Sequence, residues 1–155
     1  MAEQLSEVHR ARSVDGAGRA SFVIALLGLA VSAYLTVEHF TSSATLACPE
    51  TGTINCQKVT TSSWSHIGPV PVAVLGLVFF VAMVVLCSPP AWRRPVLSPL
   101  RLAGAVVGVL SALGLVYVEL FEVDAICLWC TAVHLCALAL LVAVLWASGA
   151  SPARR

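Results

Sequence analysis

The sequence predicts an all-α integral membrane protein, a four-helix bundle with an extracytoplasmic loop between its first and second helices. Hydrophobic residues make up 59% of the 155 residues and charged residues only 11%, whereas soluble domains are about a quarter charged. Four uncharged stretches each reach about 20 residues, the length that crosses a bilayer. A helix satisfies all of its own backbone polar groups in lipid, so four helices are the simplest structure for these stretches.

The four helices are expected near residues 20–40, 70–87, 102–122 and 127–147, bounded by turn residues and charges. Together they form one domain over residues 20–147. The outer loop covers residues 41–69, and a short helix is expected within it, over residues 57–63. Polar tails at 1–19 and 148–155 complete the chain.

Arginine placement predicts how these helices are oriented. All eight arginines lie in the two tails or in the connection between the second and third helices, and the other side carries a single cation, Lys58. Positive residues stay on the cytoplasmic side of a membrane. Both termini are therefore expected in the cytoplasm of a multi-pass protein of the cell (plasma) membrane, with the long loop outside. The formal net charge of +1 gives no reason to expect a nucleic-acid partner.

The last apolar stretch opens with Cys127-Leu128-Trp129-Cys130. On a helix, cysteines three residues apart lie on one face, about 4.5 Å apart along the axis, a spacing that a disulfide accepts. A helix N-terminus favours negative charge and so lowers a thiol pKa. The pattern therefore predicts a redox-active pair.

The predicted topology brings Cys48 and Cys56 of the loop to the same side as Cys127 and Cys130. Two pairings stay open: Cys48–Cys56 with Cys127–Cys130, or Cys56–Cys127 with the other two free, which is the pairing of an electron relay. Two static disulfides in a non-catalytic membrane protein are the alternative. A four-thiolate zinc site is a further one, although the loop spacing is longer than zinc motifs use, and no metal is predicted.

His134 shares the helix face of the two cysteines, one turn further on. An ionisable residue inside a membrane span is a functional candidate; the imidazole could bond a cofactor oxygen, or equally a carbonyl of a neighbouring helix. Cys87 and Cys136 are expected to be small apolar residues. Glu38 and Glu119 lie at outer helix ends and are expected to be solvated.

This arrangement resembles the vitamin K epoxide reductase (VKOR) family, especially its bacterial disulfide-forming members. The resemblance covers roughly residues 20 to 147. The matching features are Cys48-x7-Cys56 in the loop, Ser62 six residues later, Gly68-Pro69-x-Pro71 followed by Gly76, and Cys127-x-x-Cys130. The unrelated DsbB family also has four helices and two outer cysteine pairs, but in the reverse order.

The resemblance implies a quinone-dependent disulfide-forming oxidoreductase with four catalytic cysteines. A separate extracytoplasmic thioredoxin-like (DsbA-like) protein would exchange with Cys48, and Cys56 would then attack Cys127. Electrons would leave through Cys130 to a quinone, menaquinone or ubiquinone. Candidate residues for contacting the quinone are Ser62, Trp64 and His134.

This chain differs from the vertebrate members at two positions that bear on their reaction. His134 stands where they have a tyrosine, one turn after the cysteine pair. Their quinone-contacting asparagine has no counterpart, since the one asparagine here is Asn55. Quinone reduction coupled to disulfide formation is therefore expected, rather than epoxide reduction.

Overall fold

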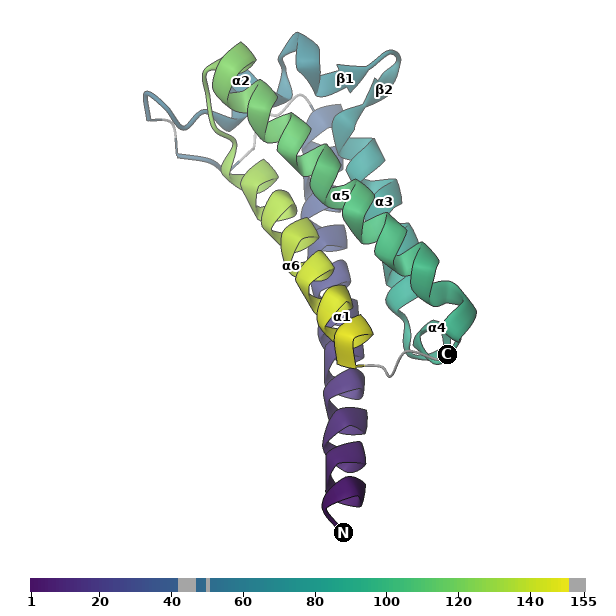
Figure 1. The fold of residues 1–155 in the computed structure, drawn as a ribbon. Helices are drawn as coiled ribbons and strands as arrows, with labels where there is room; N and C mark the ends of the chain where they lie inside the picture. The colour runs from purple at the N-terminus through teal and green to yellow at the C-terminus, as the bar shows by residue number, and fades with distance from the viewer. Residues whose placement is uncertain (42–46, 50, 151–155) are drawn as a thin grey trace.

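The structure, a computed structural model, describes residues 1–41, 47–49 and 51–150 and is mostly helical (Figure 1). Its α-helices are α1 (Ala2–Phe40), α2 (Cys56–Thr60), α3 (Val72–Cys87), α4 (Pro89–Trp92), α5 (Ser98–Val118) and α6 (Leu128–Ala150). Shorter elements are the 3-10 turns η1 (Ser63–Ser65) and η2 (Pro95–Leu97), the π-helical turn η3 (Glu119–Val123), and the strands β1 (His66–Ile67) and β2 (Val70–Pro71). Parts of the predicted loop and tail, residues 42–46, 50 and 151–155, lie outside the described residues.

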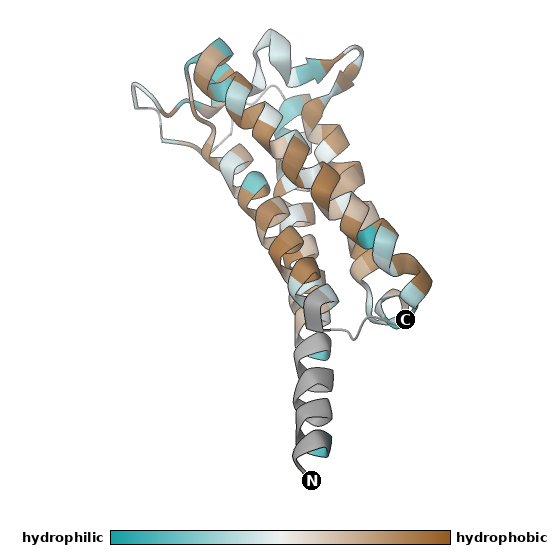
Figure 2. Ribbon diagram, viewed as in Figure 1, coloured by the Kyte–Doolittle hydropathy of each residue, from teal (hydrophilic) through white to brown (hydrophobic). Residues whose placement is uncertain are grey.

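Three helical segments of the described chain are long and apolar enough to cross a membrane: Asp15–Phe40, Pro95–Val123 and Leu128–Ser148. α3 is equally apolar but has 16 residues, about 24 Å at 1.5 Å per residue. Figure 2 shows the apolar residues along the middle of the helices, with hydrophilic residues gathered mainly toward their ends. The prediction of a helical, membrane-type chain is thus confirmed, whereas four membrane crossings stay a prediction.

Glycines let the bulky side chains of α3 fit between its neighbours. α1 packs along both α3 and α6, and α5 packs against α6 and, less extensively, α3. Gly28 of α1 lies against the ring of Phe80, and Gly108 of α5 lies against the ring of Phe79. A Cβ at either glycine would collide with the ring. These two glycines therefore leave the space that the aromatic rings of α3 occupy.

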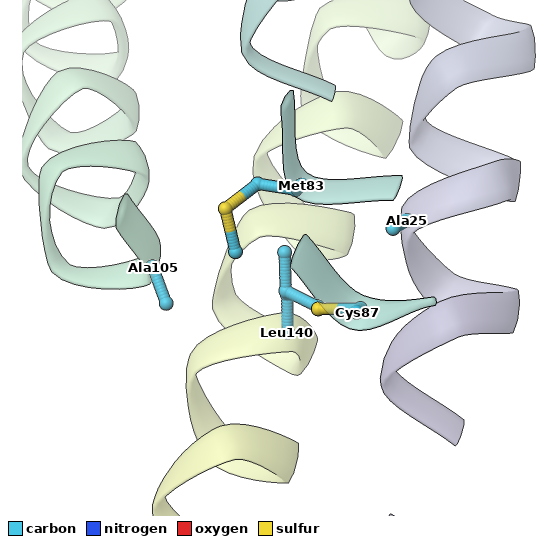
Figure 3. Packing of buried hydrophobic residues seen from close by; sticks show 5 residues of the cluster. All are labelled: Ala25, Met83, Cys87, Ala105 and Leu140. Atoms are coloured by element: carbon cyan, nitrogen blue, oxygen red, sulfur yellow. The ribbon is translucent and has the colours of Figure 1, made fainter. Parts of the chain in front are cut away.

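The buried core sits toward the end of the bundle where α3 meets α4. Its five fully buried members come from α1, α3, α5 and α6, and Figure 3 shows them: Ala25, Met83, Cys87, Ala105 and Leu140. Cys87 is a free thiol that is 1% exposed and packs among these apolar side chains. Its predicted role as a small apolar residue is confirmed.

Arg101 closes the same end of the bundle, which we call the Arg101 end. Its side chain is 5% exposed, although the sequence places Arg101 in the connection between the second and third predicted helices. Nε donates a hydrogen bond to the Leu86 carbonyl (3.1 Å) and a terminal guanidinium nitrogen donates one to the Ala91 carbonyl (3.3 Å). The guanidinium carbon lies 3.9 Å from the centroid of the Trp92 ring. Arg101 thereby satisfies carbonyls at the ends of α3 and α4, which a helix cannot satisfy itself.

The opposite end carries the loop segments, α2 and the β1–β2 hairpin, and we call it the loop end (Figure 1). The hairpin was not predicted; Gly68 turns it with φ +62°, a left-handed conformation that glycine adopts easily. Because Pro71 is still in this hairpin, α3 begins at Val72, slightly after its predicted start near residue 70. α2 overlaps the short helix expected over residues 57–63 but begins one residue earlier, at Cys56.

α1 begins at Ala2, and the helix predicted near residues 20–40 is its second half. The first half extends past the other helices at the Arg101 end (Figure 1). Residues 2–19 contain no proline and many good helix formers, so a polar sequence continues the helix.

Candidate functional site

A short parallel β-bridge joins the loop to the link before α6. Ile54 pairs with Ile126: the Ile126 N–H donates to the Thr53 carbonyl (2.9 Å), and the Asn55 N–H donates to the Ile126 carbonyl (3.1 Å). Hydrogen-bonded strands lie about 4.8 Å apart. The bridge therefore holds the two backbones side by side just before Cys56 in one segment and Cys127 in the other.

α2 is anchored at the same place. The Asn55 side-chain oxygen caps the helix by accepting the Lys58 N–H at 2.8 Å, which is a standard N-cap bond. Lys58 Nζ then donates to the Asp124 carbonyl at 3.3 Å. The first residue of α2, Cys56, is thus fixed beside the link by two independent attachments.

The four predicted catalytic cysteines are in two different redox states. Cys48 and Cys56 form a disulfide, and Cys127 and Cys130 are free thiols. Cys56 and Cys127 are both 0% exposed, while Cys48 and Cys130 are partly exposed. The structure contains the loop pair of the first proposed pairing but no Cys127–Cys130 bond. Among the described residues, no three His, Cys, Asp or Glu side chains are arranged to hold a metal.

Cys127 is the residue directly before α6, so it lies just outside the helix that was predicted to begin near it. Its sulfur accepts the Cys130 N–H at 3.2 Å, and its carbonyl accepts the Thr131 N–H at 2.9 Å. Hydrogen bonding from the Cys130 thiol and from backbone amides lowers the pKa of Cys127, although burial and the negative charge of Glu119 oppose this. Cys127 is therefore set up to be the thiolate of the pair.

The backbone of Ala47, next to Cys48, is held from two sides. Its N–H donates to the Tyr34 hydroxyl (3.1 Å), and its carbonyl accepts the Trp129 indole N–H (2.9 Å). The Tyr34 and Trp129 rings lie 4.8 Å apart. We call these three residues the Ala47 clamp. Nothing in the sequence signals it, because its partners are far apart along the chain.

Glu119 is a further residue of the site that the sequence reading missed. Its side chain is 5% exposed, and Oε2 accepts the Cys127 N–H at 3.4 Å. Glu38 at the end of α1 is 7% exposed, so the expectation that both carboxylates are solvated was wrong. For Glu119 the cause is η3, whose wider turn is followed by Asp124 in the left-handed conformation (φ 50°). This turn directs the following link back across the carboxylate.

A model of the vitamin K epoxide reductase family matches residues 19–145, which is most of the chain. The chain belongs to this family. No curated protein matches it. VKOR membership implies oxidoreductase activity and, with the apolar helices, a membrane protein. The bridged cysteine pairs at the loop end are accordingly the candidate site for this activity.

VKOR proteins are associated with quinones in general, and two buried polar atoms, one on α6 and one on α1, bear on whether a quinone fits here. Nδ1 of His134 and Oγ of Ser32 are buried, and neither has a hydrogen-bond partner. Buried polar atoms are normally paired, so both can accept a ligand's polar atoms. His134 was predicted as such a residue, and Ser32 was not.

The other two candidate quinone residues of this VKOR chain lie elsewhere. Ser62 and Trp64 line an open pocket of about 330 Å³ at the loop end, whose other lining residues are Lys58, Thr61, Ser63, Glu122 and Val123. The Ser62 hydroxyl already donates to the Val59 carbonyl at 2.8 Å, and Trp64 is 52% exposed. The structure therefore separates these two residues from His134, and their predicted role stays a prediction.

Proposed function

We propose that this chain is a membrane thiol–quinone oxidoreductase that forms disulfides in a separate thioredoxin-like protein. The observation that carries the proposal is the β-bridge, which sets a closed cysteine pair next to an open one at one end of the bundle. An oxidised pair beside a reduced pair is what a relay needs in order to pass electrons by thiol–disulfide exchange.

In this proposal the loop end faces the outside of the cell membrane and both termini face the cytoplasm. Support comes from the arginines, which avoid the loop end. α3 would provide the fourth crossing, its short length being completed by the hairpin residues before it. The partner protein then meets the cysteines in an oxidising compartment, where disulfides persist.

The first exchange takes place at the loop pair. A partner thiolate attacks Cys48, which is more exposed than Cys56; the Cys48–Cys56 bond breaks and Cys56 leaves as a thiolate. The partner's second thiol then displaces Cys48, so the partner leaves as a disulfide and the loop pair is a dithiol. Two electrons have entered the chain.

The second exchange passes these electrons to the helix pair. Cys56 attacks Cys127 of a Cys127–Cys130 disulfide, and Cys130 leaves as a thiolate. Cys48 then attacks Cys56, which re-forms the loop disulfide and releases Cys127. The resulting state, with a loop disulfide and two free thiols before α6, is the state of this structure.

A bound quinone supplies the acceptor for two electrons and two protons. His134 and Ser32 would hold it, since their unpartnered atoms are buried on α6, the helix that carries Cys130, and on α1, which packs against α6. Cys130 is partly exposed and is the thiol through which electrons leave. The quinone would be menaquinone or ubiquinone. Ser62 and Trp64 remain proposed contacts.

The test is quinone-dependent oxidation of a reduced thioredoxin-like protein by the purified chain in detergent, followed as quinol formation. Cys130→Ala is expected to abolish it. Cys136→Ala is the matched control, because it removes another free cysteine of the same helix. An unchanged rate in Cys130→Ala discards the proposal.

A second experiment identifies the partner. In Cys56→Ala the free Cys48 thiol can attack the disulfide of an oxidised partner, which breaks that disulfide and joins Cys48 to the partner. Cys56 is no longer present to displace the partner again, so this mixed disulfide should accumulate and be identified by mass spectrometry. The alternative of two structural disulfides predicts no such adduct. It also predicts that Cys127 and Cys130 stay fully oxidised in thiol-trapped cells, whether or not quinone is depleted.

A further inference from the structure

Glu119 is an unusual group to find at this position. Burying a carboxylate is unfavourable unless it is paired or well hydrogen-bonded. Glu119 is 5% exposed, and the bond that it accepts from the Cys127 N–H is long, at 3.4 Å. Among the residues that the structure describes, no lysine or arginine forms an ion pair with it. Its second oxygen is therefore available for a proton.

The titratable groups around Glu119 show which side chains can share a proton with its carboxylate. Cys127 and Cys130 at the start of α6 both interact electrostatically with the carboxylate. Lys58 of α2 bonds the Asp124 carbonyl instead, and the neighbouring acidic side chains, Glu122 and Asp124, are exposed. The titratable groups that share the buried site with Glu119 are therefore the two thiols.

A thiolate and a carboxylate in one buried site are like charges that cannot both be ionised easily. Such a pair holds one proton between its two members and titrates as a unit. Cys127 has stabilising donors for its thiolate in the Cys130 amide and thiol. In the single-proton state these donors favour a thiolate on Cys127 with the proton on Glu119, in equilibrium with a Cys127 thiol beside an ionised Glu119, so the Cys127 thiolate forms in two steps.

We propose that Glu119 is the proton acceptor of the Cys127–Cys130 dithiol, taking the Cys127 proton when the thiolate forms and releasing it as the pair is oxidised. This inference rests on the proposed function. Oxidation breaks two S–H bonds, forms one S–S bond and passes two electrons and two protons to a quinone, which leaves as a quinol. Glu119 holds one of these protons in between and is unchanged by the full cycle.

The carboxylate contacts the Cys127 amide and not the sulfur in this structure, so a purely positioning role must be separated from proton transfer. Glu119→Gln makes this separation. The glutamine oxygen can still accept the Cys127 N–H, but the side chain has no charge and cannot take up a proton. Glu119→Asp is the conservative variant that keeps the carboxylate.

Two readouts are measured in full-length protein in detergent, with Cys87 and Cys136 replaced by alanine. The first is the ultraviolet absorbance of the thiolate as a function of pH. Glu119→Gln removes a negative charge beside Cys127, so its thiolate should form at lower pH and in one step. The second is quinone-dependent turnover, which should fall about a hundredfold, the usual contribution of a general base. A positioning residue would not increase thiolate while decreasing turnover.

Asp124→Asn is the matched control, since it removes the same charge from an exposed side chain in the same link and asparagine tolerates the left-handed conformation. It should change neither readout, and Glu119→Asp should keep two-step titration and most of the turnover. An unshifted thiolate titration in Glu119→Gln overturns the inference. Absence of quinone turnover in the unaltered protein would instead reject the proposed function, and the titration would still decide the role of Glu119.

Discussion

Each end of the bundle buries one ionisable side chain of the α5–η3 segment, and the two are treated differently. At the Arg101 end, the guanidinium bonds two carbonyls and stacks on a tryptophan ring. At the loop end, Glu119 accepts one long bond from the amide of a reactive cysteine. A buried ion whose partners are all protein groups is part of the scaffold. A buried carboxylate that accepts one long bond and lies near two thiols can still take part in chemistry.

The two buried free cysteines at these ends repeat the contrast. Cys87 and Cys127 are 1% and 0% exposed. Cys87 packs among apolar side chains, whereas Cys127 receives the Cys130 amide. Burial alone therefore does not determine the chemistry of a cysteine; the donors around the sulfur do.

The largest effect should come from replacing these two cysteines, one at a time, by alanine. Cys127→Ala removes the sulfur that Cys56 attacks in the second exchange and should lower turnover about a thousandfold or more. Cys87→Ala should leave turnover per folded molecule unchanged and lower the free energy of unfolding by about 1 kcal/mol through the small cavity it creates. Turnover and unfolding in detergent measure both. A loss of turnover in folded Cys87→Ala would remove the distinction between the two ends.

Arg101→Met tests the scaffold side of the comparison. It removes the donor to the Leu86 carbonyl and one of two donors to the Ala91 carbonyl, which also accepts the Arg94 N–H, at a cost of about 2 kcal/mol in the free energy of unfolding. Thermal unfolding of the purified protein should show this loss, while the turnover of the folded fraction stays constant. A drop in turnover with unchanged unfolding would place Arg101 in the redox machinery instead.

Gly28→Ala should destabilise the bundle by about 2 kcal/mol, because the new methyl group overlaps the Phe80 ring and overpacking forces the helices apart. Gly16→Ala in the same helix is the control, since a Cβ there meets nothing. The measurement is the unfolding midpoint of each variant. Equal midpoints would show that the ring has room to move.

The smallest effect concerns the Ala47 clamp. Trp129→Phe removes the indole donor to the Ala47 carbonyl and should weaken the hold on the loop by about 1 kcal/mol. The Cys48–Cys56 bond should then be reduced a few times faster by a small dithiol, as followed by thiol trapping. An unchanged reduction rate would mean that the clamp does not restrain this part of the loop.

Much of this architecture could be predicted because lipid imposes a simple requirement on sequence. Uncharged stretches predicted the apolar helices, and the Cys127-x-x-Cys130 spacing predicted a redox pair, a role that stays a prediction. The burial of Glu119 could not be predicted, because a carboxylate at a helix end usually meets water. It is turned inward by a π-helical turn and one left-handed residue, Asp124, and no sequence pattern specifies that combination. The Ile54–Ile126 bridge likewise joins segments whose side chains carry no pairing signal.

In the Ala47 clamp, Tyr34 and Trp129 bond only main-chain atoms of Ala47, its amide and its carbonyl. The side chain at that position is exposed and takes no part. Mutations there can accumulate without loosening the attachment. The surface next to Cys48 can therefore change in shape and charge while the backbone beneath it stays held.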